Sequence, residues 1–253
     1  KYRLINTFLF KRSAINANIV TTVSNYSADR IKINFNLTDK KIEVLPNAVN
    51  TKYTLNHDKT VDKIYLKEKY DLDKFIVYVS RIEPRKNHKK LILAYQELKL
   101  WEQGINLVLI GKESFKDDEL NKLINEVSLL SKGMLVKIND VPDIDLIKFY
   151  NAATLAIFPS LCEGFGIPPI ESGVLETSTI CSNSTAMKDF TFFKDRFFDA
   201  ESKESIKRTI TKFLNTKDDS HQKDELFNIA KSIEETYNWC KTAQKLKYLI
   251  LND

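Results

Sequence analysis

Cysteine and histidine are scarce in this chain, and both are scattered. Three of each occur among 253 residues. The cysteines, Cys162, Cys181 and Cys240, lie far apart and form no C-x-x-C pair, so neither a disulfide framework nor a zinc site is indicated. We therefore predict reduced thiols, as in a cytoplasmic protein. The histidines are too dispersed for a metal centre, and we expect neither a metal nor a cofactor.

Long apolar runs and an initiating methionine are also missing. No stretch of about 18 apolar residues occurs, which argues against a transmembrane helix. The chain begins at Lys1 without a leader-like apolar region, so we expect it to begin inside a longer protein or to have been trimmed. The net charge is only +5. This excess suits a phosphate-bearing ligand or an anionic membrane, although a lysine-rich solvated surface is the simpler explanation for most of it.

What the chain does contain is a regular alternation of short apolar runs and amphipathic helical patterns. Runs typical of buried strands occur at 19–23, 42–45, 75–79, 106–110, 134–138, 154–158 and 177–181. Helical patterns occur at 25–36, 87–102, 117–130, 143–151, from 168, and at 202–215, 222–236 and 239–251. Strands that alternate with helices predict right-handed crossovers and a Rossmann-like parallel sheet with helices on both faces.

The alternation is interrupted once, which predicts a division of the chain. Residues 1–50 hold too few strands for a domain, so we interpret them as the end of a preceding Rossmann-like domain and the crossover from it. Residues 51–60 are polar and aperiodic, and are the predicted linker. Residues 61–236 are expected to form the main domain, and 237–253 a terminal helix. An aromatic stretch at 190–198 is expected to be irregular.

Two loops, each at the carboxyl end of a predicted strand, hold the candidate ligand-binding residues. Glu163 and Glu171 bracket the glycine- and proline-rich segment 164–169, where a helix is expected to begin. Glycine lets a backbone approach a ligand closely, and a helix N-terminus attracts phosphate. The other loop offers Arg81 and Lys86, cations suited to phosphate. Because such strand ends share one sheet edge, we expect both loops to face one ligand.

The two loops together suggest the chemistry of that ligand. Carboxylates repel phosphate, so Glu163 and Glu171 are expected to accept hydrogen bonds from sugar and ribose hydroxyls. A sugar nucleotide satisfies every group at once. Simpler interpretations exist for single residues: Glu171 could favour the first turn of a helix electrostatically, Glu163 could pair with a surface lysine, and Phe165 fits a core residue equally well.

Taken in order, these motifs resemble the carboxyl-terminal half of a retaining glycosyltransferase of family 4, a group with two Rossmann-like domains (the GT-B fold). The resemblance covers nearly the whole chain and is carried by segments 23–27, 44–49, 78–87, 107–111, 159–171, 182–184 and 237–239. It implies a nucleotide-sugar donor-binding domain at 61–236 and a last helix that returns toward the first domain. Met187-Lys188 replaces the usual Pro-Glu pair, so contacts there are not carried over.

The resemblance also implies roles for matched residues. Arg81 and Lys86 would hold the donor diphosphate and stabilise charge on the departing nucleotide, and Glu163 would touch hydroxyls of the transferred sugar. The other implied donor contacts are the backbone N–H groups of Phe165, Gly166 and Ile167 with sugar or phosphate, Glu171 with the ribose, and Val141 and Asp143 near the base. No metal is implied.

The implied function is transfer of a sugar, with GDP-mannose as first candidate donor and UDP-sugars next, to a glycan or lipid-linked acceptor in bacterial surface polysaccharide synthesis. Because most of a first domain is missing, this chain is expected to bind donor and transfer poorly. The basic-apolar segment 1–12 fits a helix against that missing domain better than a contact with the inner face of the membrane. A non-catalytic module that binds a sugar nucleotide or a partner protein is the alternative function. A phosphorylase-like enzyme of similar architecture is a further alternative, but no lysine site for a pyridoxal cofactor is recognisable in this sequence.

Overall fold

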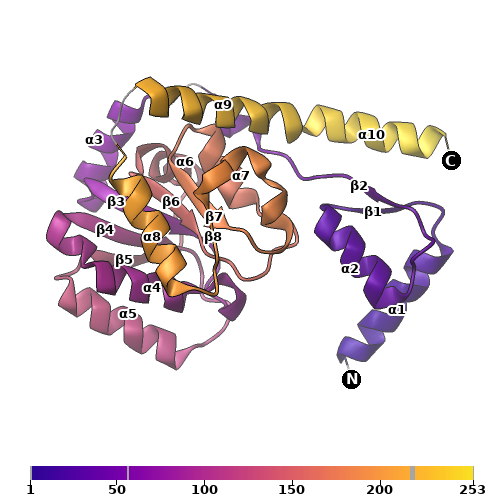
Figure 1. Cartoon of the computed structure of the whole chain (residues 1–253), viewed down its shortest axis with the longest axis horizontal. Helices are drawn as coiled ribbons and strands as arrows, with labels where there is room; N and C mark the ends of the chain where they lie inside the picture. Colours follow the sequence, from indigo (N-terminus) through magenta and orange to yellow (C-terminus); the bar gives the residue numbers. More distant parts are fainter. Residues whose placement is uncertain (1, 56, 217–219, 253) are drawn as a thin grey trace. The chain divides into compact units, whose positions relative to one another are not determined.

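The computed structural model describes residues 2–55, 57–216 and 220–252, with side chains from Ile5 onward. These residues form two compact units (Figure 1). One unit combines residues 1–48 with 237–253, and the other consists of 49–236.

The larger unit is built on a parallel sheet of six strands in the order β5-β4-β3-β6-β7-β8. The strands are β3 Lys74–Val79, β4 Ile105–Ile110, β5 Leu135–Ile138, β6 Leu155–Phe158, β7 Thr179–Ser182 and β8 Phe197–Phe198. β3 is central, since Ile76 is in register with Leu107 of β4 on one side and with Leu155 of β6 on the other. The strand order therefore reverses between β3 and β6, and ligands of such sheets bind at this switch point.

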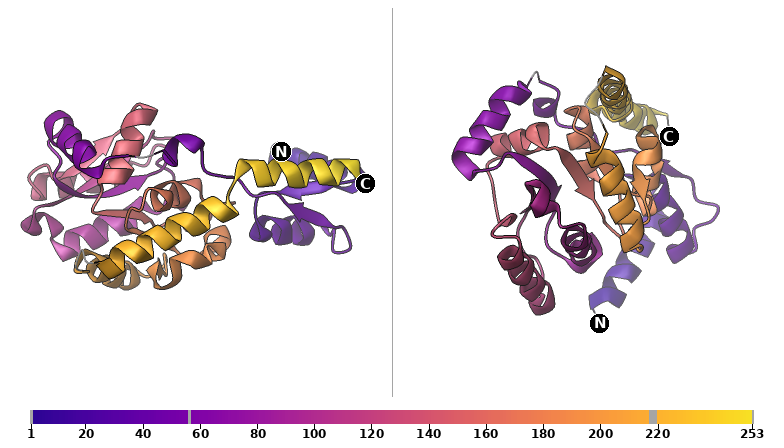
Figure 2. Two further views of the ribbon diagram at one scale, coloured as in Figure 1. Left: turned by 90° about the horizontal axis from the view of Figure 1, so that it is seen from above. Right: turned by 60° about the vertical axis from the view of Figure 1, so that its left-hand side comes forward.

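Helices cover both faces of this sheet (Figure 2). Packing contacts join α4 to α5 and α8, and separately join α3 to α6, α6 to α7 and α7 to α9. The helices are α3 Lys59–Tyr70, α4 His88–Leu98, α5 Asp118–Leu130, α6 Asp143–Ala152, α7 Ile167–Val174, α8 Lys203–Leu214 and α9 Ser220–Thr236. The predicted Rossmann-like class, a parallel sheet between two helical layers, is confirmed.

The core follows from the apolar runs that predicted the strands. All four residues of β6 are buried, as are Phe75, Ile76, Val77 and Tyr78 in β3. Strands covered on both faces are expected to lack polar alternation. Polar caps fix where several helices begin: the side chain of Asp117 accepts from Leu120 N at the start of α5, and that of Ser202 accepts from Ser205 N at the start of α8.

α3 is an element that the sequence reasoning did not predict. The segment expected to be a linker, 51–60, contains the 3₁₀ turn η1 Thr51–Tyr53 and the start of α3. α3 packs on α6 through both rings and polar groups: the Tyr70 and Phe149 ring centroids are 4.9 Å apart. The buried carboxylate of Asp145 accepts hydrogen bonds from Tyr65 (2.9 Å), Lys69 (2.7 Å) and Tyr70 (2.7 Å). Because these contacts use polar side chains, the apolar periodicity that marks a helix is weak here.

Some predicted boundaries are also corrected. The helix expected at 87–102 ends at Leu98, because Lys99 adopts a left-handed conformation and the 3₁₀ turn η3 Leu100–Gln103 follows. The strand expected at 177–181 is shifted to Thr179–Ser182. The aromatic stretch 190–198 holds the 3₁₀ segment η5 Thr191–Arg196 and the short strand β8, next to the 3₁₀ turn η4 Thr185–Asp189.

The smaller unit contains α1 Tyr2–Asn16, β1 Val20–Thr22, α2 Asn25–Phe35, β2 Ile42–Val44 and α10 Trp239–Leu251. β1 and β2 pair in parallel. α10 is joined to the end of β2, since Thr242 Oγ1 donates to the carbonyl of Pro46 (3.1 Å) and Lys245 Nζ donates to that of Val44 (3.1 Å). Among the described helices, none combines the length and the apolar character needed to cross a bilayer.

Candidate functional site

The loops that follow β3 and β6 meet at the switch point of the sheet. Leu161 N donates to the carbonyl of Arg85 (2.8 Å). The side-chain amide of Asn87 donates to the carbonyl of Pro159 (3.0 Å) and to that of Ala200 (2.8 Å). Asn87 has a φ of 60°, a conformation that asparagine tolerates better than most residues. The two loops that carry the predicted cations and carboxylates are therefore joined at their bases.

Glu163 is the centre of the ionic contacts between these loops. Its Oε1 accepts from Lys86 Nζ at 2.5 Å, and its Oε2 accepts from Arg85 Nη1 at 2.7 Å. The side chains of Lys86 and Glu163 are each only 12% exposed. Burial alone would raise the pKa of Glu163, but the contacts with Lys86, Ser160 and Arg85 outweigh it and hold the pKa below its usual range. Glu163 is thus a carboxylate held by two cations.

Arg81 is arranged differently from Lys86. Its side chain is 65% exposed, and the guanidinium lies 3.6 Å from the Glu83 carboxylate. The structure therefore brings Lys86 to Glu163 and leaves Arg81 at the outer rim of the same loop. An exposed guanidinium with one distant partner is able to turn toward an arriving anion.

Gly111 permits the loop after β4 to pass close to the loop that carries Arg81. A Cβ on Gly111 would lie 2.0 Å from the carbonyl oxygen of Ser80, and the φ of Gly111 is 146°. The two loops are then joined by main-chain bonds, from Ile82 N to Lys112 O (2.9 Å) and from Ser114 N to Ile82 O (3.1 Å). Glycine here is required by close approach of two backbones.

The glycine-rich segment before α7 also depends on close packing. Gly166 has a φ of 107°, and a Cβ there would lie 3.0 Å from Met187 Cγ. The ring of Phe165 is buried and packs edge-on against Phe190 at 5.6 Å between centroids, so its side chain belongs to the core. Ile167 is exposed at the start of α7. Phe165, Gly166 and Ile167 can therefore offer a ligand only main-chain polar groups, among them their N–H donors.

Glu171 lies on α7 in a separate polar cluster. Burial raises its pKa to about 7, and the Tyr53 hydroxyl, the Lys52 ammonium and the Tyr150 hydroxyl oppose that shift only in part. The Tyr53 and Tyr150 rings are 6.2 Å apart, and both are buried. The Tyr150 hydroxyl has no hydrogen-bond partner among the described residues. Such an unpaired buried hydroxyl is costly unless something else compensates it.

Val141 and Asp143 lie at the start of α6, near the same cluster. Val141 is half-buried in the loop after β5. Asp143 is exposed, and its carboxylate accepts from Lys52 Nζ at 2.5 Å. The negative charge of Asp143 also contributes to the raised pKa of Glu171. Asp143 and Glu171, predicted for the base side and the ribose side, are therefore close enough to interact, and Lys52 acts on both carboxylates.

Arg85, Lys52, Tyr53 and Tyr150 are the site residues that the sequence reasoning missed. Arg85 lay inside the basic loop that was singled out, but nothing in the sequence distinguished its role from that of a solvated neighbour. Lys52 and Tyr53 lay in a segment interpreted as a linker. Their contacts are with residues about a hundred positions away, so only the topology reveals them.

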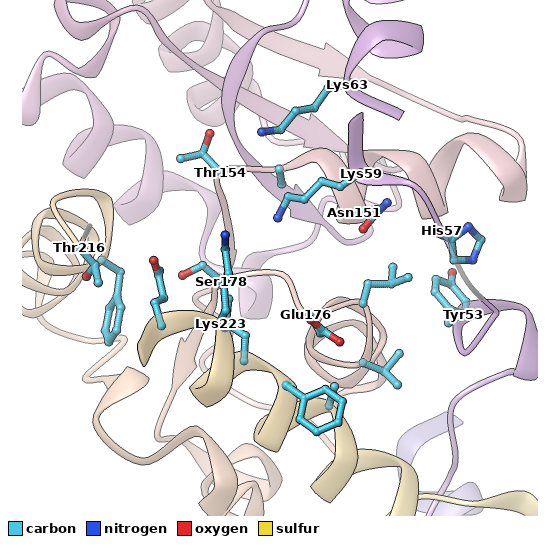
Figure 3. A pocket seen from close by; sticks show the side chains of 18 of the residues that line it. Tyr53, His57, Lys59, Lys63, Asn151, Thr154, Glu176, Ser178, Thr216 and Lys223 are labelled. Atoms are coloured by element: carbon cyan, nitrogen blue, oxygen red, sulfur yellow. The ribbon is translucent and has the colours of Figure 1, made fainter. Parts of the chain in front are cut away.

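An open cavity of about 1000 Å³ lies elsewhere in the larger unit (Figure 3). Asp73, Lys74, Thr154 and Ser178 line it from the amino ends of β3, β6 and β7, the opposite edge from the loops described above. Figure 3 shows Lys59 and Lys63 of α3 and Lys223 of α9 around it. The cavity therefore opens at the other edge of the sheet, although Tyr53, which belongs to the Glu171 cluster, also lines it. Among the described residues, no group of three or more histidine, cysteine, aspartate or glutamate side chains could hold a metal ion.

The fold is that of the GT-B glycosyltransferases. A glycosyltransferase from Rickettsia africae superposes with a TM-score of 0.82 at 19% identity, covering 96% of this chain and 67% of that one. HepE from Anabaena, solved in complex with UDP-glucose, gives a TM-score of 0.78 at 12% identity over 98% of this chain and 68% of that one. The chain belongs to the family described as glycosyl transferases group 1, whose sequence model matches residues 63–226. The predicted glycosyltransferase resemblance is thus confirmed.

Curated relatives include enzymes of O-antigen synthesis. The serotype-specific mannosyltransferase WbdA of Escherichia coli is 30% identical over 90% of this chain and 28% of its own length. O-antigen chain mannosyltransferase B of Escherichia coli is 29% identical over 68% of this chain and 45% of its own length. A diphospho-undecaprenol N-acetylgalactosaminyltransferase of Campylobacter jejuni is 31% identical over 77% and 49%. This chain therefore spans less than half of each of these relatives.

Proposed function

We propose that this chain is the donor-binding half of a retaining glycosyltransferase that transfers a hexose from a nucleotide-diphosphate sugar. The observation that carries the proposal is the contact of Lys86 with Glu163 at the switch point, with Glu171 on the helix that follows. A cation and two carboxylates at this edge match the three parts of such a donor: diphosphate, sugar and ribose.

The cations serve the diphosphate. Lys86 donates at present to Glu163 and would turn to a phosphate oxygen when the donor binds, while exposed Arg81 would close over the other phosphate. Both charges would then offset the negative charge that develops on the departing nucleotide. The N-terminus of α7, with the main-chain N–H groups of Phe165, Gly166 and Ile167, adds a favourable dipole at the same place.

The carboxylates serve the hydroxyls. Glu163 would accept from hydroxyls of the transferred sugar, and Glu171 from the two ribose hydroxyls. Val141 and Asp143 would lie beside the base, because Asp143 begins the helix next to the Glu171 cluster and Val141 lies in the loop just before it. Carboxylates are suited to this task since they only accept hydrogen bonds when ionised.

A mannosyl donor, with GDP-mannose first, is the proposed substrate, and a growing glycan or lipid-linked sugar of a bacterial surface polysaccharide is the proposed acceptor. The support is that several relatives are mannosyltransferases, two of them of O-antigen chains. The N-acetylgalactosaminyltransferase relative makes UDP-linked donors the next candidates.

The acceptor side of the reaction is proposed to require residues outside this chain. In this proposal residues 1–50 end an amino-terminal domain that binds acceptor, 51–60 connect the two domains, 61–236 bind donor, and 237–253 return to the first domain. The support is that the chain spans only part of its relatives. Transfer by these residues alone is expected to be weak.

Calorimetric titration of the 253-residue chain with GDP, UDP, GDP-mannose, UDP-glucose and UDP-N-acetylgalactosamine tests the proposal. We expect GDP and GDP-mannose to bind, and Arg81→Met and Glu171→Gln to weaken binding about tenfold, as loss of a charged contact predicts. Glu97→Gln, which removes a surface ion pair with Lys203 and Lys207, is the control and should leave binding unchanged. Absence of binding by every nucleotide would overturn the proposal.

A further inference from the structure

The two oxygens of the Glu163 carboxylate are held by cations of different kinds. Oε1 accepts from the Lys86 ammonium at 2.5 Å, and Oε2 accepts from Arg85 Nη1 at 2.7 Å. Each cation therefore has an oxygen of its own, and either contact can open while the other persists.

Arg85 is attached to its surroundings much more extensively than Lys86. Its Nη1 also donates to the carbonyl of Cys162 (2.9 Å), and its Nη2 donates to Glu83 Oε1 (2.9 Å). Its own carbonyl accepts from Leu161 N (2.8 Å). Side chain and main chain of Arg85 thus connect the loop after β3 to the loop after β6.

This difference decides which cation can leave Glu163. A lysine ammonium is a point charge on a flexible stem and turns toward a stronger anion at little cost. The planar guanidinium of Arg85 would have to give up its bonds to Glu163, Glu83 and Cys162 together. A diphosphate that enters this edge of the sheet therefore competes effectively for Lys86 and poorly for Arg85.

We propose that Arg85 is a positioning residue, which keeps Glu163 oriented through Oε2 while Lys86 turns to the donor phosphates and leaves Oε1 open for a hydroxyl of the sugar. This inference rests on the proposed function, because it assumes a sugar nucleotide as ligand. Lys86 would then act as an exchangeable partner of Glu163 and Arg85 as a constant one.

The low exposure of Glu163 explains why a constant partner is needed. A carboxylate that is mostly buried and loses its only cation becomes protonated or turns toward water. Either change would remove the acceptor that the sugar hydroxyl requires. With Arg85 still in place, Glu163 keeps one cation beside it, and Arg85 is, after Lys86 and Ser160, one of the contacts that lower its pKa.

The test compares two ligands that differ only in the sugar. Calorimetry measures the affinity of a nucleoside diphosphate and that of the matching nucleotide sugar. The pair is GDP and GDP-mannose, or the UDP pair if that binds better. The proteins compared are the wild-type chain, Arg85→Met, Arg85→Lys and Arg208→Met. The readout is the ratio of the two affinities, which isolates the sugar. Arg208 is an exposed arginine of α8 outside the site, and its variant is the matched control.

We expect Arg85→Met to lower this ratio about tenfold, the loss expected for one charge-assisted hydrogen bond. Arg85→Lys should restore part of it, and Arg208→Met should leave it unchanged. Thermal unfolding verifies that each variant is folded, and Glu83→Gln, which removes the negative charge that Nη2 of Arg85 contacts, provides a milder change of the same kind. An unchanged ratio in Arg85→Met, with both affinities falling equally, would show a merely structural connection and overturn the role of Arg85. If the wild-type chain binds neither ligand of either pair, the proposed function fails as well.

Discussion

The hydroxyl of Tyr150 is buried beside the carboxylate of Glu171 and meets ordinary hydrogen-bond geometry with none of the described residues. It is near enough to lower the pKa of Glu171, as are Tyr53 and Lys52, while burial and the charge of Asp143 raise it. The balance leaves the pKa at about 7. A carboxylate proposed to accept ribose hydroxyls is therefore poised between its neutral and ionised forms near neutral pH.

Nucleotide affinity should consequently depend on pH. The folded-state pKa of Glu171, about 7, lies above the ordinary value of 4.5, so the neutral form predominates below pH 7 and the acceptor-only carboxylate above it. We expect binding to strengthen by several-fold between about pH 6 and pH 8, as titration of one such group allows. Calorimetry of GDP binding over this range measures it.

Glu171→Gln is the control for this pH dependence, because the phosphates of the ligand titrate in the same range. The variant should bind more weakly at pH 8 and lose the part of the pH profile that belongs to Glu171. Identical profiles for wild type and variant would contradict the assignment of Glu171 to the ligand.

The stability effects of two buried tyrosines should differ. Tyr150 and Tyr95 are both 0% exposed, but Tyr95 donates to the carbonyl of Ile105 at 2.9 Å, whereas the Tyr150 hydroxyl is unpaired. Tyr95→Phe leaves a buried carbonyl without its donor and should cost about 1 kcal/mol of unfolding free energy. Tyr150→Phe should cost less, because its hydroxyl makes no bond of ordinary geometry and is favourable only through the Glu171 carboxylate, whose pKa it lowers. Urea denaturation measures both, and an equal loss in the two variants would show that Tyr150 has a partner in solution.

The site could be predicted in part because some of its charged residues stand in loops that directly follow predicted strands. Lys86 and Glu163 each follow an apolar strand, and parallel strands bring such positions to one edge. Their mutual contact at 2.5 Å was not predictable, since many basic residues compete for a carboxylate. Arg85 and Tyr53 were missed for the same reason. Their partners are selected by loop conformation, which sequence patterns do not encode.

The fold was predictable where burial dictates residue type. β3 and β6 are apolar because helices cover both faces of the sheet, so their runs are visible in the sequence. α3 was not visible, because its contact with α6 includes the hydrogen bonds of Tyr65, Lys69 and Tyr70 to Asp145. Such polar contacts weaken the apolar period that marks a helix, and residues 51–60 were interpreted as a linker.

That polar interface should contribute substantially to stability. Asp145 is 1% exposed, and we expect Asp145→Asn to cost roughly 2 kcal/mol of unfolding free energy, because three donors lose a charged acceptor. Burial raises the pKa of Asp145, but its bonds with Lys69, Tyr70 and Tyr65 outweigh burial and lower it. The contribution is therefore present above the unfolded value of 3.8 and is lost as pH falls through the lower folded value.

Chemical denaturation of wild type and Asp145→Asn at pH 7 and at pH 3 measures the cost of the substitution and its dependence on pH. The difference between them should be full at pH 7 and smaller at pH 3. Asp140→Asn is the matched control, since Asp140 pairs with Lys112 at 2.8 Å but is 70% exposed, where ion pairs contribute little. A cost for Asp145→Asn no larger than that of the control would contradict the interpretation of the α3–α6 interface.

Gly111 should be among the least replaceable glycines of the larger unit. A Cβ at this position would lie 2.0 Å from the Ser80 carbonyl oxygen, which belongs to the backbone and cannot rotate away. Gly111→Ala should therefore cost about 3 kcal/mol or more and displace the loop that carries Arg81. Gly133 also has a positive φ, 86°, but nothing lies within 4 Å of its Cβ position, so Gly133→Ala should cost only about 1 kcal/mol of backbone strain. Comparison of the two variants by urea denaturation and GDP titration separates close approach from strain, and equal effects on both properties would show that the approach of the two loops is unimportant.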